Sequence, residues 1–202
     1  PQNGYLNRSR VSLDYIPRDN NHPYRPAIIF RMAEAYLSYA EALNESSERM
    51  SHKQEILDNL NKIRHRAGIA EYGTGTDENG FTRIKINFSD QKEVRRLIHK
   101  ERRVEFVGEG VRYHDLRRWK TAHYGIGNLN EQGENPDWGV NGPDYGMNYY
   151  GTEYTDQGDN AFFKRTKYMD RVYPRKFYWY PIHQSEIDKD PTLVQGPFWL
   201  GE

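Results

Sequence analysis

The sequence contains no cysteine, which excludes disulfides, thiol nucleophiles and cysteine-ligated metals. It also lacks any apolar run near the roughly 18 residues that a membrane-spanning helix needs. Positive charge is not in excess, since Lys plus Arg and Asp plus Glu each number 29, whereas a general nucleic-acid binder needs a basic surface. We therefore expect no nucleic-acid partner, and any export signal is expected to lie upstream of Pro1.

Hydrophobic residues are scarce for a chain of 202 residues, at 36%, whereas aromatic residues reach 14% and include 16 tyrosines. A tyrosine buries a large ring and keeps a polar tip, so it suits surfaces that stay half in contact with water. The composition therefore favours aromatic surfaces over a large dry core.

Apolar residues at helical spacing predict two helices early in the chain, over about 29–43 and 51–67. Ser51 followed by Gln54 has the pattern of a capping box, and Gly68 is placed to end the second helix. The short loop between the helices predicts antiparallel neighbours. Because one such pair buries little by itself, we expect it to be the end unit of a longer, tetratricopeptide-like array.

Two further helices are predicted later in the chain. Asp90 with Glu93 opens one that runs to about Gly108, and another covers about 112–122. The expected fold class is therefore mainly α, built from helical pairs with long irregular aromatic-rich loops and little β structure.

The loops carry weaker signals. Residues 70–88 are rich in Gly and Thr, and Asn79-Gly80 predicts a turn within a hairpin. Residues 123–176 show neither a helical nor a strand period, and a stretch of this length is either functional or disordered. Its aromatic content argues against disorder. A short strand is predicted from Phe177 to Pro181.

The aromatic stretch supplies the candidate binding residues. Flat rings stack on the apolar faces of sugars while amide and guanidinium groups bond the hydroxyls. The alternative is that these rings pack the loop onto the helices. Of the rings, we expect Tyr149 and Tyr150 to lie inside and Trp138 to be exposed. The candidate ligand-binding residues are Trp138, Asn141, Tyr145, Tyr149, Tyr150 and Arg165.

A dense group of charges invites a catalytic interpretation, because Glu101 and Glu105 lie one helical turn apart and a glycosidase needs paired carboxylates. Arginines are abundant nearby and pair with carboxylates through two bonds at a time. We therefore interpret the group as a structural ion-pair network, which Arg64 and Arg66 are expected to join. Its members are Glu101, Arg102, Glu105, Arg112, Asp115 and Arg118.

Signals for metals, cofactors and catalysis are missing. The seven histidines show no HExxH or HxH spacing, and no phosphate-binding glycine loop or nucleophile elbow occurs. We expect no catalytic residue, no metal and no cofactor.

Four segments carry a family resemblance. The first two segments are 31–42 (RMAEAYLSYAEA) and 61–68 (NKIRHRAG). The third is 100–120, which contains the runs ERRVE, GEG and RYHDLRRWK. The fourth is 180–197, which contains YPIHQSEI, DP and QGP. In this order they resemble motifs of the C-terminal half of the SusD/RagB family. His183, Asp190 and Gly196 depart from the pattern, all of them in the terminal turn.

The resemblance implies that residues 1–202 form the C-terminal SusD/RagB-like domain, with the N-terminal half of the family absent. It implies a non-catalytic protein of polysaccharide utilisation, exposed at the outer-membrane surface of Bacteroidetes. The protein would bind an oligosaccharide or other nutrient for delivery to a SusC-like, TonB-dependent transporter. Its membrane attachment would be a lipid anchor that this chain does not contain.

Two rival functions stay open at this point. The chain could be a helical scaffold that docks a partner protein without binding a ligand of its own. It could also be a hydrolase that uses Glu101 and Glu105, in which case turnover of a glycoside would be lost in Glu105→Gln.

Overall fold

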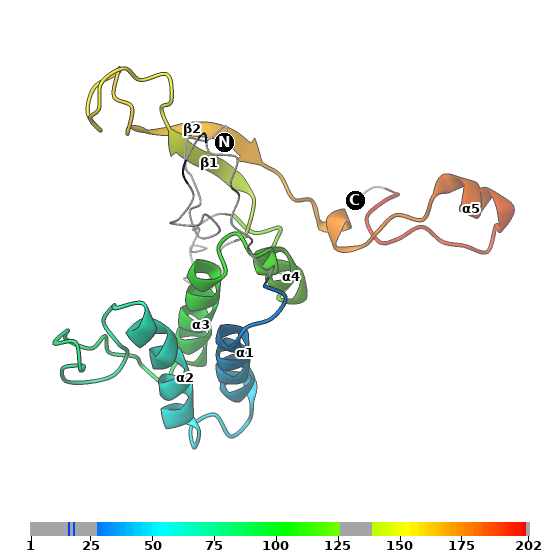
Figure 1. The fold of residues 1–202 in the computed structure, drawn as a ribbon. Coiled ribbons are helices and arrows are strands. Elements are labelled where there is room, and N and C mark those ends of the chain that lie inside the picture. Colours follow the sequence, from blue (N-terminus) through cyan, green and yellow to red (C-terminus); the bar gives the residue numbers. More distant parts are fainter. Residues whose placement is uncertain (1–15, 17, 19–27, 126–138, 201–202) are drawn as a thin grey trace. The chain divides into compact units, whose positions relative to one another are not determined.

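The computed structural model describes residues 16, 18, 28–125 and 139–200. These described residues divide into two compact units, one ending at Arg112 and the other beginning at Tyr113 (Figure 1). Most of the regular structure is helical, with one small sheet, so the predicted fold class is confirmed. The assignment of 1–202 to a single domain stays a prediction.

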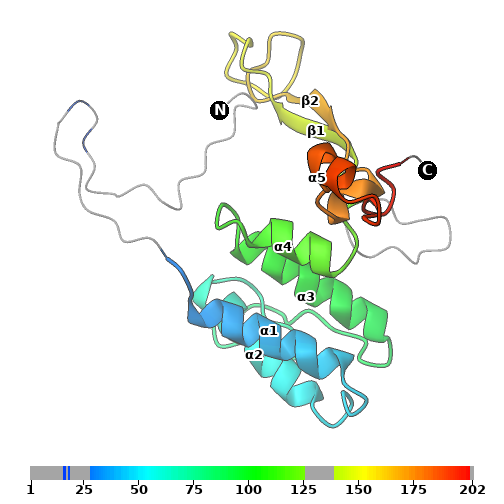
Figure 2. The ribbon, with the colours of Figure 1, turned by 90° about the vertical axis from the view of Figure 1, so that its right-hand side faces the viewer.

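The first unit is built on α1 (Met32–Glu45), α2 (Lys53–Arg66) and α3 (Gln91–Glu105). Helix α1 packs against both others and runs opposite to them, as Figures 1 and 2 show. Alanine, leucine and glutamate make α1 a good helix former, and its apolar stripe faces the neighbouring helices. The large apolar side chains that are fully buried at the centre are Leu37, Ile56, Leu60, Val94 and Ile98.

The sequence predicted three end signals for these helices, and the structure confirms two of them. Asp90 caps α3 by accepting the backbone N–H groups of Lys92 and Glu93, as predicted. Gly68 ends α2 at φ +66°, also as predicted. The capping box at Ser51 is wrong, because its hydroxyl donates to the Glu48 carbonyl in the preceding turn.

The loop from 71 to 88 contains the predicted turn. Thr76 and Thr82 form an antiparallel bridge around Gly80, which has φ +81°. The side chain of Asp77 accepts the backbone N–H groups of Glu71, Asn79 and Phe81. Burial opposes the charge of this carboxylate, but the three backbone donors outweigh it and lower its pKa. The loop is therefore a folded element.

Helix α4 (Val111–Arg118) begins at the boundary between the units and ends before the predicted Ala122. Lys120 adopts φ +57°, and the N–H of Thr121 bonds the carbonyl of Leu116. These bonds form a Schellman motif, which stops the helix. A helical period alone does not report such a stop.

The second unit contains strands β1 (Gly142–Met147) and β2 (Arg165–Arg171), which pair antiparallel with an irregularity after Asp144. The prediction of no strand within 123–176 is wrong. Every residue of β2 is exposed, so no buried face imposes the alternation by which a strand is recognised.

The remaining described elements are the 3₁₀ helix η1 (Arg175–Tyr178) and helix α5 (Gln184–Lys189). The strand predicted from Phe177 to Pro181 is therefore wrong, because Phe177 and Tyr178 lie in η1 and residues 179–181 form no strand. The guanidinium of Arg117 donates to the carbonyls of Phe177 and Tyr178 at 3.1 and 2.7 Å. Those carbonyls are thus bonded to a side chain instead of a neighbouring strand.

Candidate functional site

An arginine covers an aromatic ring on the exposed hairpin of the second unit. Tyr145 lies on β1, and the guanidinium carbon of Arg165, the first residue of β2, sits 4.1 Å from its ring centre. Such a cation–π contact orients the guanidinium and leaves its donors available. Among the described residues, no ion pair involves Arg165. The structure thus brings two of the six candidate residues into direct contact.

Tyr149 and Tyr150 follow β1 and are 47% and 80% exposed, so the prediction that they lie inside is wrong. Their ring centres lie 4.2 Å apart at 32°, and the Tyr149 hydroxyl donates to that of Tyr150 at 3.0 Å. This hydrogen bond, followed by burial, raises the pKa of Tyr149. The two rings therefore form a partly stacked, neutral platform that faces water.

Gly151 closes the turn that carries the two tyrosines. Its N–H bonds the carbonyl of Asn148. A Cβ atom at this position would lie 2.5 Å from the backbone nitrogen of Phe162. The backbone itself packs where a side chain would otherwise sit.

A second aromatic group lies in the loop between the strands. Tyr154 is 86% exposed, and its ring centre lies 5.9 Å from that of Phe162 and 6.4 Å from that of Phe163. The two phenylalanines meet edge to face at 5.3 Å. Sequence reasoning picked out the aromatic content of this stretch but did not separate the two groups.

Asn141 does not join the tyrosines. It lies just before β1, at the opposite end of the strand from Tyr149. Its amide donates to the carbonyl of His123 at 2.7 Å and accepts the N–H of Tyr173. These bonds hold three segments of the unit together, so its polar groups are already engaged within the protein. Trp138 lies outside the described residues.

The charged group of the first unit lies mainly inside. Arg64 and Glu101 pair at 2.5 Å, and the hydroxyl of Tyr72 donates to the same carboxylate at 2.8 Å. Burial, together with the charge of Glu101, raises the pKa of Tyr72. One buried carboxylate is therefore shared by a guanidinium and a phenol.

Glu105 is shared by two arginines. Arg66 donates to its two oxygens at 2.5 and 2.6 Å, and Arg31 also pairs with it. Arg31 additionally grips Glu109 through two bonds of 2.8 and 2.9 Å. Burial opposes the charge of Arg31, but the bonds to Glu109 and Glu105 outweigh it and raise its pKa. Sequence reasoning left Arg31 out of the network, although this residue opens the RMAEAYL motif.

The other expected members of the network lie on α3 and α4. Arg102 donates to the hydroxyl of Ser38 at 3.0 Å and lies 3.9 Å from Glu41. Asp115 pairs with Arg118 at 2.9 Å within α4, and Arg112 is half-buried at the start of that helix. That all six residues form one network stays a prediction.

Across 28–125 and 139–200, no helix combines the length and apolar character needed to cross a membrane. The same segments contain no group of three or more His, Cys, Asp or Glu side chains suited to hold a metal ion.

Comparison with known proteins gives a consistent picture. A family model described as the SusD family matches residues 1–199. SusD-like proteins P25 and P38 of Formosa agariphila are each 32% identical to the chain, over 54% and 51% of its length. The chain spans 18% and 19% of those two relatives. The crystal structure of a SusD-like protein from Bacteroides fragilis matches with a TM-score of 0.54 and 26% identity, over 86% of this chain and 26% of that one.

Proposed function

The chain belongs to the SusD family, and on this premise we propose that it serves non-catalytic binding of an oligosaccharide or similar nutrient at the cell surface. The observation that carries the proposal is the exposed pair of rings at Tyr149 and Tyr150. Two adjacent, partly stacked rings on a turn form an exposed apolar patch, and such a patch suits a ligand that covers it.

The chemistry of the hairpin suits a sugar. A pyranose ring presents an apolar face that an aromatic ring covers, and hydroxyl groups around its edge. Tyr149 and Tyr150 offer the ring faces, and their hydroxyls can donate or accept. Arg165 adds donors held in place over Tyr145. Of the six candidate residues, these four form the proposed contact surface, and Trp138 remains a candidate.

Delivery to a SusC-like, TonB-dependent transporter at the outer membrane, with attachment through a lipid anchor, completes the proposal. This part rests on family membership. It is tested by copurification of the transporter with the intact protein from detergent-solubilised membranes.

A non-catalytic role is supported by the state of the two acids that a hydrolase would use. Glu101 is bonded to Arg64 and Tyr72, and Glu105 to Arg31 and Arg66. A glycosidase needs carboxyl groups that face the scissile bond of a sugar. Carboxylates surrounded by guanidinium groups fit the structural role better.

The decisive experiment is calorimetric titration of the intact protein across a panel of oligosaccharides. We expect binding of at least one glycan, weakened about tenfold or more in Tyr149→Ala/Tyr150→Ala, because stacked rings contribute roughly 1–3 kcal/mol each. Tyr39→Ala is a matched control, since this tyrosine on α1 is 48% exposed. Binding that the double variant leaves intact would remove the hairpin from the site. No binding to any glycan, with the transporter still copurifying, would favour the scaffold function.

A further inference from the structure

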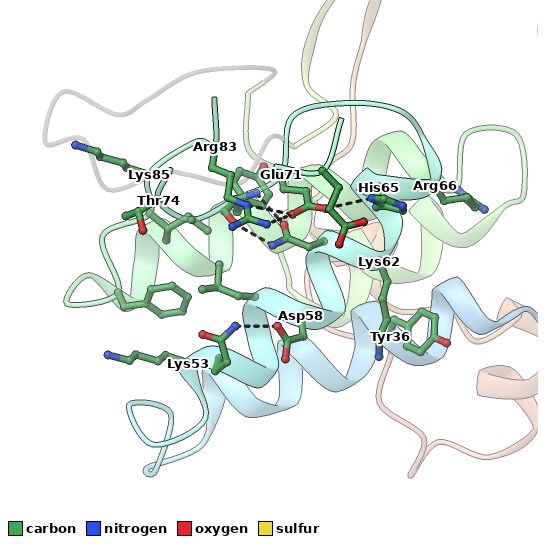
Figure 3. Close-up of a pocket in the computed structure, with 18 residues that line it drawn as sticks. Tyr36, Lys53, Asp58, Lys62, His65, Arg66, Glu71, Thr74, Arg83 and Lys85 are labelled. Carbon is green, nitrogen blue, oxygen red and sulfur yellow. Dashed lines mark hydrogen bonds and ion pairs between the residues drawn. The ribbon is translucent and has the colours of Figure 1, made fainter. Parts of the chain in front are cut away.

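A pocket of about 970 Å³ lies in the first unit, between α2 and the loop from 71 to 88 (Figure 3). Its size falls at the upper end of the roughly 300–1,000 Å³ typical of small-ligand sites. Helix α2 forms one wall, the loop forms the other, and Tyr36 of α1 closes one side. The residues of the pocket that matter below are Tyr36, Lys53, Asp58, Lys62, Glu78 and Lys85.

The wall made by the loop is fixed to the helix. The side chain of Asn61 donates to the carbonyl of Tyr72 at 2.9 Å and accepts its N–H at 2.8 Å. Arg83 holds the carboxylate of Glu71 through bonds of 2.9 and 3.1 Å. These contacts hold the start of the loop against α2, so binding needs little ordering of the loop.

Three amino groups of the pocket form no ion pair within the described part of the chain. Among the described residues, no carboxylate pairs with Lys53, Lys62 or Lys85. The ammonium of Lys62 lies 4.5 Å from the ring centre of Tyr36. Figure 3 shows Lys53 and Lys85 extending toward the same side of the pocket from its two walls. Three amines are thus available in a chain whose net charge is zero.

The acids of the pocket are of two kinds. Glu71 is held by Arg83 and by His65, the latter at 3.3 Å. Asp58 accepts the amide of Gln54 at 2.8 Å, and Glu78 is exposed. Asp58 and Glu78 would repel a ligand that carries only negative charge, but they are good acceptors for hydroxyl groups. Amines beside free carboxylates match a ligand that carries both anionic groups and hydroxyls.

From this lining, we propose that the pocket binds an acidic oligosaccharide, one that bears carboxylate or sulfate groups. Lys53 and Lys85 would contact the anionic groups, and Asp58 and Glu78 would accept bonds from the hydroxyls. The inference rests on the proposed function, for which it names the class of substrate. It places a second contact surface on the chain, separate from the tyrosines of the hairpin.

The test is an NMR titration of the intact protein with three hexasaccharides: oligogalacturonate, sulfated carrageenan and neutral maltohexaose. We expect the amides of Asn61 and Thr74 to shift with an acidic sugar and to stay unchanged with maltohexaose. Shifts at Tyr149 and Tyr150 report separately on the hairpin. The carboxylated and sulfated sugars show which anionic group the pocket prefers, and binding of either one supports the inference.

Matched variants give the second readout. Lys53→Gln/Lys85→Gln should weaken binding of the acidic sugar about tenfold, as expected for the loss of two partly exposed ion pairs. The double variant should also make binding less dependent on salt concentration. Lys92→Gln is the control, since this exposed lysine on α3 lies outside the pocket. Unchanged affinity in the double variant would overturn the inference.

The outcomes separate the inference from the proposed function. Shifts at the hairpin with none in the pocket would overturn the acidic site and leave the glycan-binding function standing. Shifts in the pocket alone would support the acidic site and reject the hairpin. No shift at either place with any sugar would overturn both, and equal pocket shifts with maltohexaose would overturn the selectivity for acidic sugars.

Discussion

Arg64 of α2 and Glu101 of α3 form an ion pair in the interior of the first unit, where their side chains are 10% and 7% exposed. The ring of Tyr72 lies 4.3 Å from the guanidinium carbon, and its hydroxyl bonds the same carboxylate. The pair connects two helices and the start of the loop that follows α2. Removing either residue would leave the charge of the other buried without a counterion, which is unfavourable.

Glu101→Gln should destabilise the first unit by about 3 kcal/mol, because it leaves the charge of Arg64 buried without a counterion. Hydrogen exchange of the α2 and α3 amides in the intact protein measures this change. The control is Glu45→Gln, which breaks the more exposed pair with Arg95 and should change stability by less than about 1 kcal/mol. Equal effects of the two variants would contradict the structural role.

Leu37→Ala tests the apolar centre of the helices. Leu37 is fully buried, and its truncation removes contacts and leaves a cavity, so a loss of about 2–5 kcal/mol is expected. Ile29→Ala serves as the control, since Ile29 is 96% exposed and its replacement should stay within about 0.5 kcal/mol. Amide exchange rates in α1 report both.

His123 makes the second unit sensitive to acid. Burial, followed by the charge of Arg175, lowers its pKa, while the Nδ1 atom lies 2.9 Å from the hydroxyl of Tyr178 and the ring packs on Tyr124. The folded state thus binds this proton less tightly than the unfolded chain, whose histidine pKa is about 6.5. The stability that neutral His123 contributes to the second unit should therefore fall as the pH drops through about 6.5.

Amide exchange around 121–125 and 175–179, compared at pH 7.5 and 5.5, checks this expectation. His123→Gln should reduce the difference between the two pH values. A unit that becomes more stable on acidification would contradict the sign of the effect.

Gly151→Ala should disorder the turn that carries Tyr149 and Tyr150, because the added Cβ meets the backbone of Phe162 at 2.5 Å. We expect weaker glycan binding together with a changed tyrosine signal in near-ultraviolet circular dichroism. Gly158→Ala is the control: its φ of +89° costs about 1 kcal/mol, but no atom lies within 4 Å of the new Cβ. The same loss of binding in both variants would exclude a specific role for the turn.

The helices of the first unit could be predicted because each has a buried stripe and two have clear end signals. Asp90 and Gly68 act locally, so their residue types suffice to place the start of α3 and the end of α2. The capping box predicted at Ser51 does not form, because the Ser51 hydroxyl bonds the Glu48 carbonyl in the preceding turn. Competition among nearby acceptors is invisible in a motif of two residues.

The candidate sites were less predictable, for physical reasons. Strand β2 has no buried face, so its sequence carries no alternation. The turn after Tyr149 and Tyr150 brings Gly151 close to Phe162, two residues that no local pattern connects. The pocket beside α2 depends on bonds between Asn61 and Tyr72, and residue types alone did not indicate it.

The two bonds between Asn61 and Tyr72 have an evolutionary consequence. Together with the grip of Arg83 on Glu71, they anchor the loop near both of its ends. Replacements at exposed positions between Gly73 and Thr82, apart from the buried Asp77, can therefore accumulate without disturbing the three helices. Related proteins could acquire new ligand preferences by rewriting this short segment while inheriting an unaltered scaffold.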